Sequence, residues 1–329
     1  MQRLRLLALL LFLAGAYVTA LVLWDPFPSS EFRFDRGTNG IWLGHKWYTG
    51  HEVRSGEPVP PSELLQLKKN LDRHGIRDLF IHVGPTLSDG SIGDSSGDLF
   101  SELRTIFPEA RLLAWVGARV ENIQLQDLAF QEGLIASLEG LRAVGFDGVH
   151  FDFEPMVDYE PGYLSLLSEV RDAMGPNFMI SQATPRANFM GIFPGPLRRS
   201  YWSDDFYLET MAKSDQTVLM AYDSGLNYIN PYVAFVRHQT GLLADWGCSV
   251  PGHEVLVGLP AYEDVPLYSN PKVENLKTAS LGVRSALEAS STASRCVVGV
   301  AIYSNWVTDD SEWRDFRRYW MHPVQDSAR

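Results

Sequence analysis

Short apolar runs recur along the chain from residue 40 to residue 303, and longer stretches separate them. Strand-like runs occur at 40–44, 79–84, 112–116, 149–153, 178–183, 218–222, 255–259 and 297–303. Helix-like runs lie between them, among others at 61–74, 128–144, 163–174, 231–246 and 276–289. Gly75, Gly145, Gly175 and Gly247 follow helix-like runs, in the position where a left-handed helix cap favours glycine. The pattern therefore predicts a regular alternation of strands and helices.

Such alternation predicts parallel strands joined by right-handed crossovers. Eight strand–helix units predict an α/β fold that closes into a (β/α)8 TIM barrel. An open doubly wound sheet is the alternative. No Gly-x-Gly-x-x-Gly motif opens a helix after the first strand, which disfavours a dinucleotide-binding version of that sheet. A chain of 329 residues is long enough for one barrel of about 250 residues after the N-terminus is set aside.

The fourth predicted strand carries the most informative polar residues, in the run Gly-Phe-Asp-Gly-Val-His-Phe-Asp-Phe-Glu-Pro at 145–155. Side chains alternate faces along a strand, so His150, Asp152 and Glu154 point the same way. Glu154 is the last of them before Pro155, at the strand end where barrel enzymes carry their catalytic groups. A buried polar ladder that only packs the barrel is the alternative. We favour a functional role, because three ionisable groups on one buried face are costly unless they are paired or used.

This run resembles the signature of glycoside hydrolase family 18, the chitinase-like enzymes. The family pattern is Asp-Gly-x-Asp-x-Asp-x-Glu on the fourth barrel strand. Asp147, Gly148, Asp152 and Glu154 match it, and His150 replaces the middle Asp.

A second family motif, Met-x-Tyr-Asp on the sixth strand, stands at 220–223 as Met-Ala-Tyr-Asp. Two further family elements are weak here. The Gly-Gly ending of the third strand keeps one glycine in the run 115–118. Tyr303 lies nearest the place of the family's eighth-strand Trp, and Trp306 follows it. The resemblance extends over residues from about 38 to 320, and the two motifs carry it.

The resemblance implies a glycosidase that cleaves a β-linked glycan containing N-acetylglucosamine and retains the anomeric configuration. In this family the substrate's own 2-acetamido oxygen attacks the anomeric carbon, so the enzyme needs one acid and one group that orients the acetamide. The implied roles are general acid/base for Glu154, orientation of the acetamide for Asp152 and Tyr222, and a sugar contact for Asp223. A histidine at position 150 can donate a hydrogen bond to Asp152, and a protonated His150 would hold Asp152 ionised more firmly.

Further substrate contacts are expected beyond these residues, since aromatic faces stack on sugar rings. The candidates are Trp115, Gln182, Tyr262, Tyr303 and Trp306, and His150 is also counted among the residues near the substrate. No metal and no cofactor is expected. The sequence does not distinguish between chitin-like oligomers, peptidoglycan and N-linked glycans as the substrate.

Two alternatives come from other functional classes. One is a catalytically weak or inactive, lectin-like barrel that binds carbohydrate, and the retained Glu154 argues against it. The other is a metal-dependent barrel hydrolase that uses His45, His82 and His150 with a carboxylate. The sequence contains no His-x-His and no His-x-x-x-His, which metal-binding barrel hydrolases generally use.

The net charge limits the kinds of partner that the protein can bind, and the two cysteines allow two alternatives. A net charge of -12 argues against nucleic acid and against an anionic membrane surface, because both attract basic proteins. Cys248 and Cys296 precede the seventh and eighth strands, so both are expected at the N-terminal face of the barrel. They form either one disulfide or two buried thiols. We expect a monomer.

The N-terminus predicts a separate segment. Arg3 and Arg5 precede an uncharged apolar stretch at 6–24, which is long enough to span a bilayer. The basic residues favour an N-terminus that stays inside, with the barrel on the extracytoplasmic side. A cleaved signal peptide and a secreted barrel are the alternative. The expected organisation is an anchor or signal peptide at 1–25, a linker at 26–38, the catalytic barrel at 39–322 and a tail at 323–329.

Overall fold

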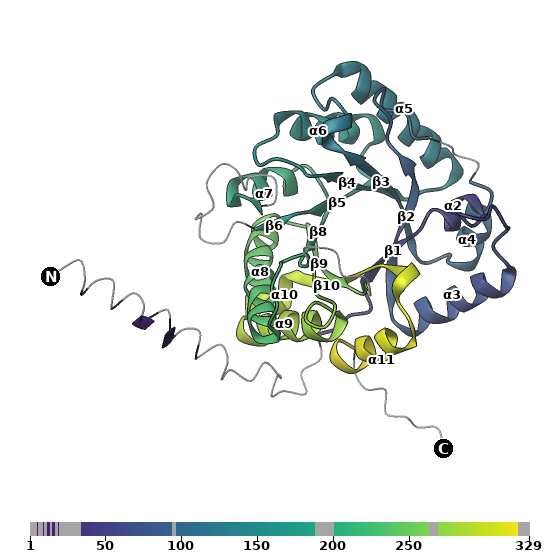
Figure 1. The fold of residues 1–329 in the computed structure, drawn as a ribbon. Helices are drawn as coiled ribbons and strands as arrows, with labels where there is room; N and C mark the ends of the chain where they lie inside the picture. The colour runs from purple at the N-terminus through teal and green to yellow at the C-terminus, as the bar shows by residue number, and fades with distance from the viewer. Residues whose placement is uncertain are drawn as a thin grey trace.

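The computed structural model describes residues 34–93, 97–187, 201–262 and 269–321, together with a few isolated positions before residue 20. Eight strands close into a barrel in the spatial order β1 (Asn39–Leu43), β10 (Val297–Tyr303), β9 (Glu254–Pro260), β8 (Gln216–Met220), β5 (Met179–Thr184), β4 (Gly148–Glu154), β3 (Arg111–Arg119) and β2 (Ile76–Pro85) (Figure 1). Every neighbouring pair is parallel. Each predicted strand overlaps one of these eight, so the predicted closed barrel is confirmed.

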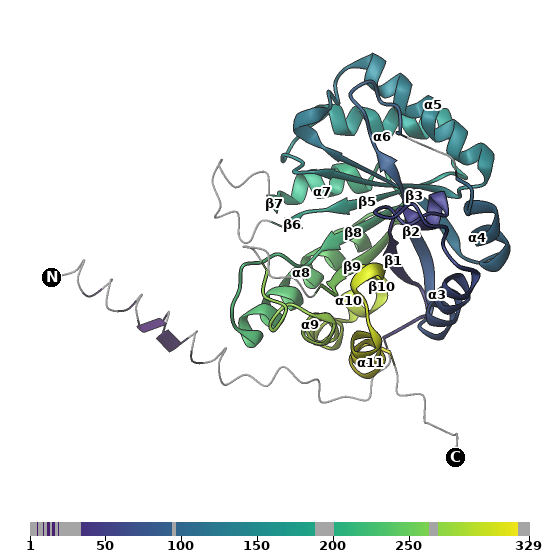
Figure 2. The same cartoon turned by 45° about the vertical axis from the view of Figure 1, so that its right-hand side comes forward.

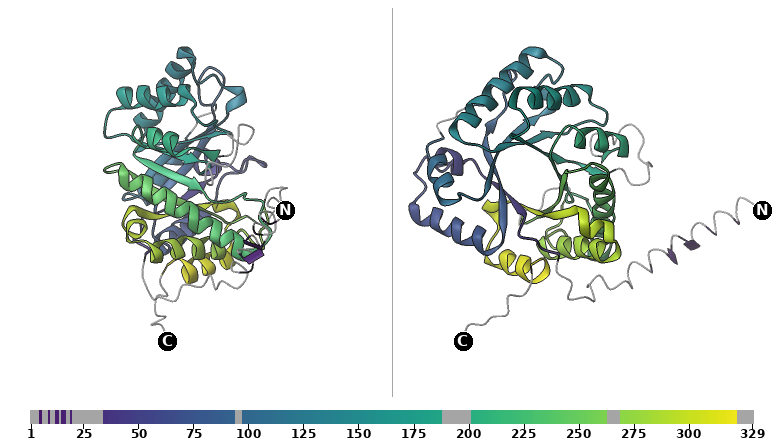
Figure 3. Two further views of the ribbon diagram at one scale, coloured as in Figure 1. Left: turned by 90° about the vertical axis from the view of Figure 1, so that its left-hand side faces the viewer. Right: turned by 180° about the vertical axis from the view of Figure 1, so that it is seen from behind.

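Helices lie outside the ring of strands, as Figure 2 and Figure 3 show from other directions. The predicted helices are α3 (Pro61–Arg73), α5 (Leu128–Val144), α6 (Pro161–Met174), α8 (Ile229–Ser249) and α9 (Leu276–Ala289). Elements that the sequence pattern did not single out are α2 (Lys46–Thr49), α4 (Phe100–Ile106), η1 (Val120–Asn122), α7 (Asp204–Met211), α10 (Ser291–Cys296), η4 (Asn305–Val307) and α11 (Asp310–Tyr319). Two short strands, β6 (Arg186–Ala187) and β7 (Tyr201–Trp202), pair in parallel outside the barrel.

Two glycines that were predicted as helix caps have different roles. Gly145 ends α5 in the left-handed conformation with φ of 111°, as predicted. Gly247 lies inside α8, so its prediction as a cap is wrong. A Cβ at Gly247 would lie 2.7 Å from Val255 Cγ1 on β9. Glycine is needed there because the helix approaches the strand too closely for any side chain.

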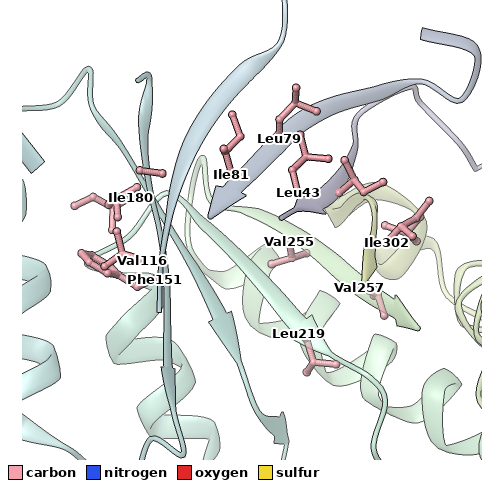
Figure 4. Packing of buried hydrophobic residues seen from close by; sticks show 14 of the residues in the cluster. Leu43, Leu79, Ile81, Val116, Phe151, Ile180, Leu219, Val255, Val257 and Ile302 are labelled. Atoms are coloured by element: carbon pink, nitrogen blue, oxygen red, sulfur yellow. The ribbon is translucent and has the colours of Figure 1, made fainter. Parts of the chain in front are cut away.

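The core has two layers, which follow from the alternation of side chains along each strand. Inside the barrel, Trp42, Phe80, Leu113, Val218 and Leu256 are among the buried residues that pack together. A larger layer fills the space between strands and helices, where the labelled residues of Figure 4 include Leu43, Leu79, Phe151, Ile180 and Val257. Full burial of each such side chain contributes about 1.5–3 kcal/mol.

This alternation sets the direction of the candidate site residues. On β4, Val149, Phe151 and Phe153 belong to the outer layer. His150 and Asp152 therefore point into the barrel, and Glu154 follows them at the C-terminal end of the strand.

The N-terminal end of the barrel is filled by a charged cluster, here called the floor network: Arg77, Asp78, Arg111, Gln216 and Glu254. Asp78 is fully buried and binds Arg77 Nε at 2.9 Å and Arg111 Nη2 at 2.6 Å. The same two arginines reach Glu254 Oε2 at 2.8 and 2.6 Å. Three strands, β2, β3 and β9, thus share one set of ion pairs, and Gln216 of β8 donates hydrogen bonds to both carboxylates. The pairing satisfies charges that would otherwise be costly to bury.

A disulfide joins Cys248 at the end of α8 to Cys296 at the end of α10, with their Cα atoms 5.5 Å apart. Of the two alternatives for these cysteines, the bonded one is therefore correct. They precede β9 and β10, on the N-terminal side of the barrel as predicted.

The predicted N-terminal anchor at 6–24 and the tail at 323–329 lie outside the described residues, apart from isolated positions of the former. Within the described part of the chain, none of the helices combines the length and the apolar character that crossing a bilayer requires.

Candidate active site

Glu154 is the last residue of β4 and lies at the open, C-terminal end of the barrel. It is exposed and lines two adjoining cavities. One has a volume of about 130 Å³ and is also lined by Tyr222, Asp223 and Arg186. The other, of about 430 Å³, is also lined by Asp152, His82 and Arg119. A carboxyl group shared by two cavities is placed to act on a bond that passes from one cavity into the other.

The acids at positions 152 and 154 lie close enough to change one another's protonation. Burial raises the pKa of Asp152, while the hydrogen bond from Trp115 opposes this rise. The negative charge of Asp152 is the main cause that raises the pKa of Glu154, followed by desolvation and by Asp223, while Arg186 lowers it. Glu154 therefore holds a proton at a higher pH than an ordinary glutamate, as a general acid requires.

Tyr222 and Asp223 follow the end of β8 and line the smaller cavity together with Glu154. The adjoining cavities beside Glu154 are here called the groove. Tyr222 is buried and its ring stacks on Tyr303, with centroids 5.5 Å apart. Burial is the first cause that raises the pKa of Tyr222, so its hydroxyl keeps its proton and can donate a hydrogen bond. Asp223 adopts the left-handed conformation with φ of 54°. Its Oδ1 accepts a hydrogen bond from Tyr262 at 2.8 Å.

Two residues of the site were missed by sequence reasoning. Arg186, on β6, donates to the carbonyl oxygens of Tyr222 and Asp223. It follows the end of β5, and a cation so close to a barrel strand end is a signal that could have found it. Glu274 is fully buried and accepts hydrogen bonds from Ser224 N and Oγ, which holds the segment after Asp223 in place. No local sequence pattern identifies it.

The predicted hydrogen bond from His150 to Asp152 is wrong. His150 Nδ1 lies 2.8 Å from Ser181 Oγ, and Nε2 has no partner among the described residues. The ring is fully buried and stacks on Phe80 at 3.9 Å between centroids. Burial lowers the pKa of His150 to about 3, so the imidazole is neutral and does not hold Asp152 ionised through its charge.

The prediction of a substrate contact at Gln182 is also wrong. Gln182 lies beside Ser181 on β5, and Ser181 points into the barrel toward His150. Gln182 therefore points out to the helix layer, where its Oε1 accepts from Tyr163 at 3.0 Å. Its Nε2 donates to Thr217 Oγ1 at 3.1 Å. The side chain is fully buried away from the groove.

Three of the other predicted aromatic residues, Trp115, Tyr303 and Trp306, pack against one another. Trp115 and Trp306 have parallel rings with centroids 6.2 Å apart, and Tyr303 meets Trp306 edge-on at 5.7 Å. Trp306 is 50% exposed and, with Trp115 and His82, lines a third cavity of about 750 Å³. Because His82 also lines the cavity beside Glu154, the two spaces adjoin.

The histidines that the metal-hydrolase alternative needs do not come together. The rings of His45 and His82 lie 5.4 Å apart, but His150 is buried against Phe80 and Trp42. Among the residues with described positions, no three His, Cys, Asp or Glu side chains are grouped so that they could hold a metal ion.

Comparison with known proteins identifies the fold. No family model and no curated protein matches the sequence. Among solved structures, a family 18 chitinase from Chromobacterium violaceum is similar, with a TM-score of 0.59 and 16% identity, over 85% of this chain and 83% of that one. The spore cortex-lytic enzyme SleL of Bacillus cereus has a TM-score of 0.58 and 12% identity, over 85% and 73%. A chitinase-like agglutinin from Robinia pseudoacacia has a TM-score of 0.54 and 15% identity, over 86% of this chain and 99% of that one. The barrel therefore has the fold of family 18 chitinases and chitinase-like proteins.

Proposed function

We propose that the protein is a glycoside hydrolase that cleaves a β-linked glycan containing N-acetylglucosamine. The observation that carries the proposal is the position of Glu154. It ends β4 between two cavities, two residues after Asp152, and lines one of these cavities together with Tyr222. The family 18 fold, found from comparisons that name chitinases, supports the same reaction class.

The proposed mechanism uses the substrate's 2-acetamido group as the nucleophile. Its carbonyl oxygen bonds to the anomeric carbon while Glu154 gives its proton to the departing glycosidic oxygen. Asp152 accepts a hydrogen bond from the acetamide N–H, and Tyr222 donates one to the acetamide oxygen. Water then attacks the anomeric carbon, Glu154 takes back a proton, and the acetamide is released. Two displacements at one carbon retain its configuration.

Spacing supports this mechanism over one that uses two separated carboxylates. Residues two apart on a strand have Cα atoms about 6–7 Å apart with side chains on one face. Asp152 thus lies beside the acid, where it can bind the acetamide of the same sugar. The cavity that Trp115 and Trp306 line adjoins this site and is suited to neighbouring sugar units. We further propose that the barrel acts on an extracytoplasmic glycan, as the basic and apolar N-terminal sequence indicates.

Replacing Glu154 with glutamine tests the proposal. Glutamine has nearly the same shape but carries no acidic proton, so turnover of a chitin oligomer is expected to fall at least ~10²-fold, the usual scale for one acid–base group. Binding of the oligomer, measured by calorimetry, should persist. Glu139→Gln, on an exposed position of α5, is the matched control and should keep wild-type turnover. Near-normal turnover of Glu154→Gln would reject the assignment.

A second test addresses substrate assistance. Aryl glycosides of N-acetylglucosamine oligomers should be hydrolysed, whereas matched glucose oligomers, which lack the acetamide, should not. Equal rates on the two series would contradict the mechanism.

A carbohydrate-binding barrel without turnover is the second candidate function, because a chitinase-like agglutinin shares the fold. The retained Glu154, with its raised pKa, favours the hydrolase. A wild-type protein that binds N-acetylglucosamine oligomers by calorimetry but releases no product from oligomers of any length would establish the binding function instead.

A further inference from the structure

A chain of hydrogen bonds leads from the floor network to His150. Gln216 donates through Nε2 to Asp78 Oδ2 at 2.7 Å, so its Oε1 is the oxygen that faces Ser181 Oγ at 2.7 Å. Two oxygens at that distance need a proton between them, and the Ser181 hydroxyl supplies it. Ser181 Oγ also lies 2.8 Å from His150 Nδ1. Since Ser181 has only one proton, His150 Nδ1 must be the donor in this second bond.

This chain of hydrogen bonds fixes the tautomer of His150. The imidazole is neutral, because burial lowers its pKa to about 3, and a neutral ring carries one N–H. That hydrogen is on Nδ1, so Nε2 presents only a lone pair to the barrel interior. His150 therefore has no proton to donate to Asp152.

Trp115 supplies the hydrogen bond that His150 cannot. The indole Nε1 donates to Asp152 Oδ2 at 2.9 Å. Trp115 is paired in register with His150, so its side chain leans along β3 to reach the next inward residue of β4. The ring is fixed by His82, edge-on at 4.8 Å, and by Trp306, which is parallel to it. Asp152 Oδ1 is buried and has no partner among the described residues.

We propose that Trp115 is a positioning residue for Asp152: its indole N–H holds Oδ2 and so fixes the orientation of the carboxylate beside Glu154. The inference rests on the proposed function, and it assigns to the N–H of Trp115 a role that sugar stacking does not use. His150 in its fixed tautomer leaves this carboxylate without a second donor from β4.

The titratable groups around Asp152 must be considered before pH is used as a readout. They are Glu154 and His150 on β4, His82 on β2, Tyr163 on α6, Tyr222 after β8 and Tyr303 on β10. The substitution Trp115→Phe changes none of them. It keeps a planar aromatic ring at this position, smaller than the indole, and removes the N–H.

Loss of that N–H should act first on Asp152, the group that accepts it. The expected effect of Trp115→Phe is a fall in kcat of about 10- to 100-fold, the scale of one hydrogen bond to a charged group, with KM little changed. The hydrogen bond lowers the pKa of Asp152, so its loss raises that pKa further. Because the proposed mechanism uses Asp152 in its ionised form, the acidic limb of the pH profile should move to higher pH.

Trp320→Phe is the matched control. Trp320 is 2% exposed, and its indole N–H donates to Asn39 Oδ1 at 3.0 Å, away from the groove. This variant loses an equivalent buried hydrogen bond and should keep the wild-type kcat and pH profile. Wild-type kinetics and an unmoved acidic limb in Trp115→Phe would overturn the proposal.

A measurement without substrate separates this proposal from the proposed function. In carbon-13 NMR titrations, the Asp152 carboxyl should show a higher pKa in Trp115→Phe than in the wild type, with Asp152→Asn used to assign the signal. In the wild type, the Trp115 indole N–H resonance should follow the same titration, whether or not the variant folds. An indole resonance that does not respond to Asp152 overturns the proposal. A protein that shows both NMR effects yet hydrolyses no glycan would refute only the glycosidase function.

Discussion

At the N-terminal end of the barrel, Asp78 and Glu254 are bound by two arginines, Arg77 and Arg111. At the C-terminal end, Asp152 and Glu154 lie two residues apart on one strand, and the charge of Asp152 raises the pKa of Glu154. The floor network pairs every carboxylate with a cation. The candidate active site leaves Asp152 Oδ1 without a partner among the described residues.

The two ends of the barrel therefore arrange their carboxylates differently, one in a way that favours stability and the other in a way that favours acid–base chemistry. Paired charges hold strands together, but they have no free proton or lone pair to offer a substrate. Carboxyl groups placed near one another keep a proton at higher pH, which is useful for catalysis and unfavourable for folding. Each of the following changes tests one side of this contrast.

The largest effect on folding is expected from Asp78→Asn in the floor network. The substitution leaves two arginines without their buried carboxylate, and removing one partner of a buried ion pair costs about 3–5 kcal/mol. Chemical denaturation should show this loss in the free energy of unfolding. Asp72→Asn is the control, because Asp72 forms an exposed pair with Lys68 and should change stability by less than about 1 kcal/mol. Equal losses in the two variants would contradict the role given to the floor.

Asp152→Asn should instead affect the reaction. Turnover is expected to fall at least ~10²-fold, because in the proposed mechanism this carboxylate orients the acetamide. Removal of the charge at position 152 also removes the main cause of the raised pKa of Glu154. Glu154 then loses its proton at lower pH, so the basic limb of the residual activity should move to lower pH. A basic limb at the wild-type position would show that another group sets it.

The smallest expected effect is on the pH dependence of stability. The pKa of Glu154 is raised in the folded protein above its ordinary value of 4.5, so the folded state binds this proton more tightly than the unfolded chain does. The stability that this proton contributes is fully present below the ordinary pKa of 4.5 and is lost as the pH rises through the raised pKa of the folded protein. Glu154→Gln should therefore gain stability relative to the wild type across that window. A difference in melting temperature between Glu154→Gln and the wild type that stays constant from pH 4 to 9 would contradict the raised pKa.

The sequence predicted the barrel because the periodicity of apolar runs is a local signal that repeats in every unit. It predicted the common direction of His150, Asp152 and Glu154 from alternation within one strand. It failed at Gln182, because the inward face of β5 is set by its register with β4, which puts Ser181 opposite His150. When both faces of a strand are buried, both carry apolar residues, so the apolar run alone does not show which alternate residues point into the barrel.

Contacts between distant segments account for the remaining omissions. Arg186 and Glu274 belong to the connections after β5 and β9, and both form hydrogen bonds with the segment that follows β8. The tautomer of His150 depends on Ser181 and Gln216, which come from two other strands. No pattern within a strand reports such contacts.

The bond between Cys248 and Cys296 makes the barrel depend on the compartment in which it folds. The two cysteines are 48 residues apart and enclose β9, α9 and most of α10. In the chain-entropy model, closing a loop of that length favours the folded state by about 4 kcal/mol. Thiols stay reduced in the cytosol and are oxidised in secretory compartments. The same polypeptide should therefore be less stable when it is produced in a reducing host cytosol than in an oxidising one, and preparations from the two sources are different samples for any measurement of its folding.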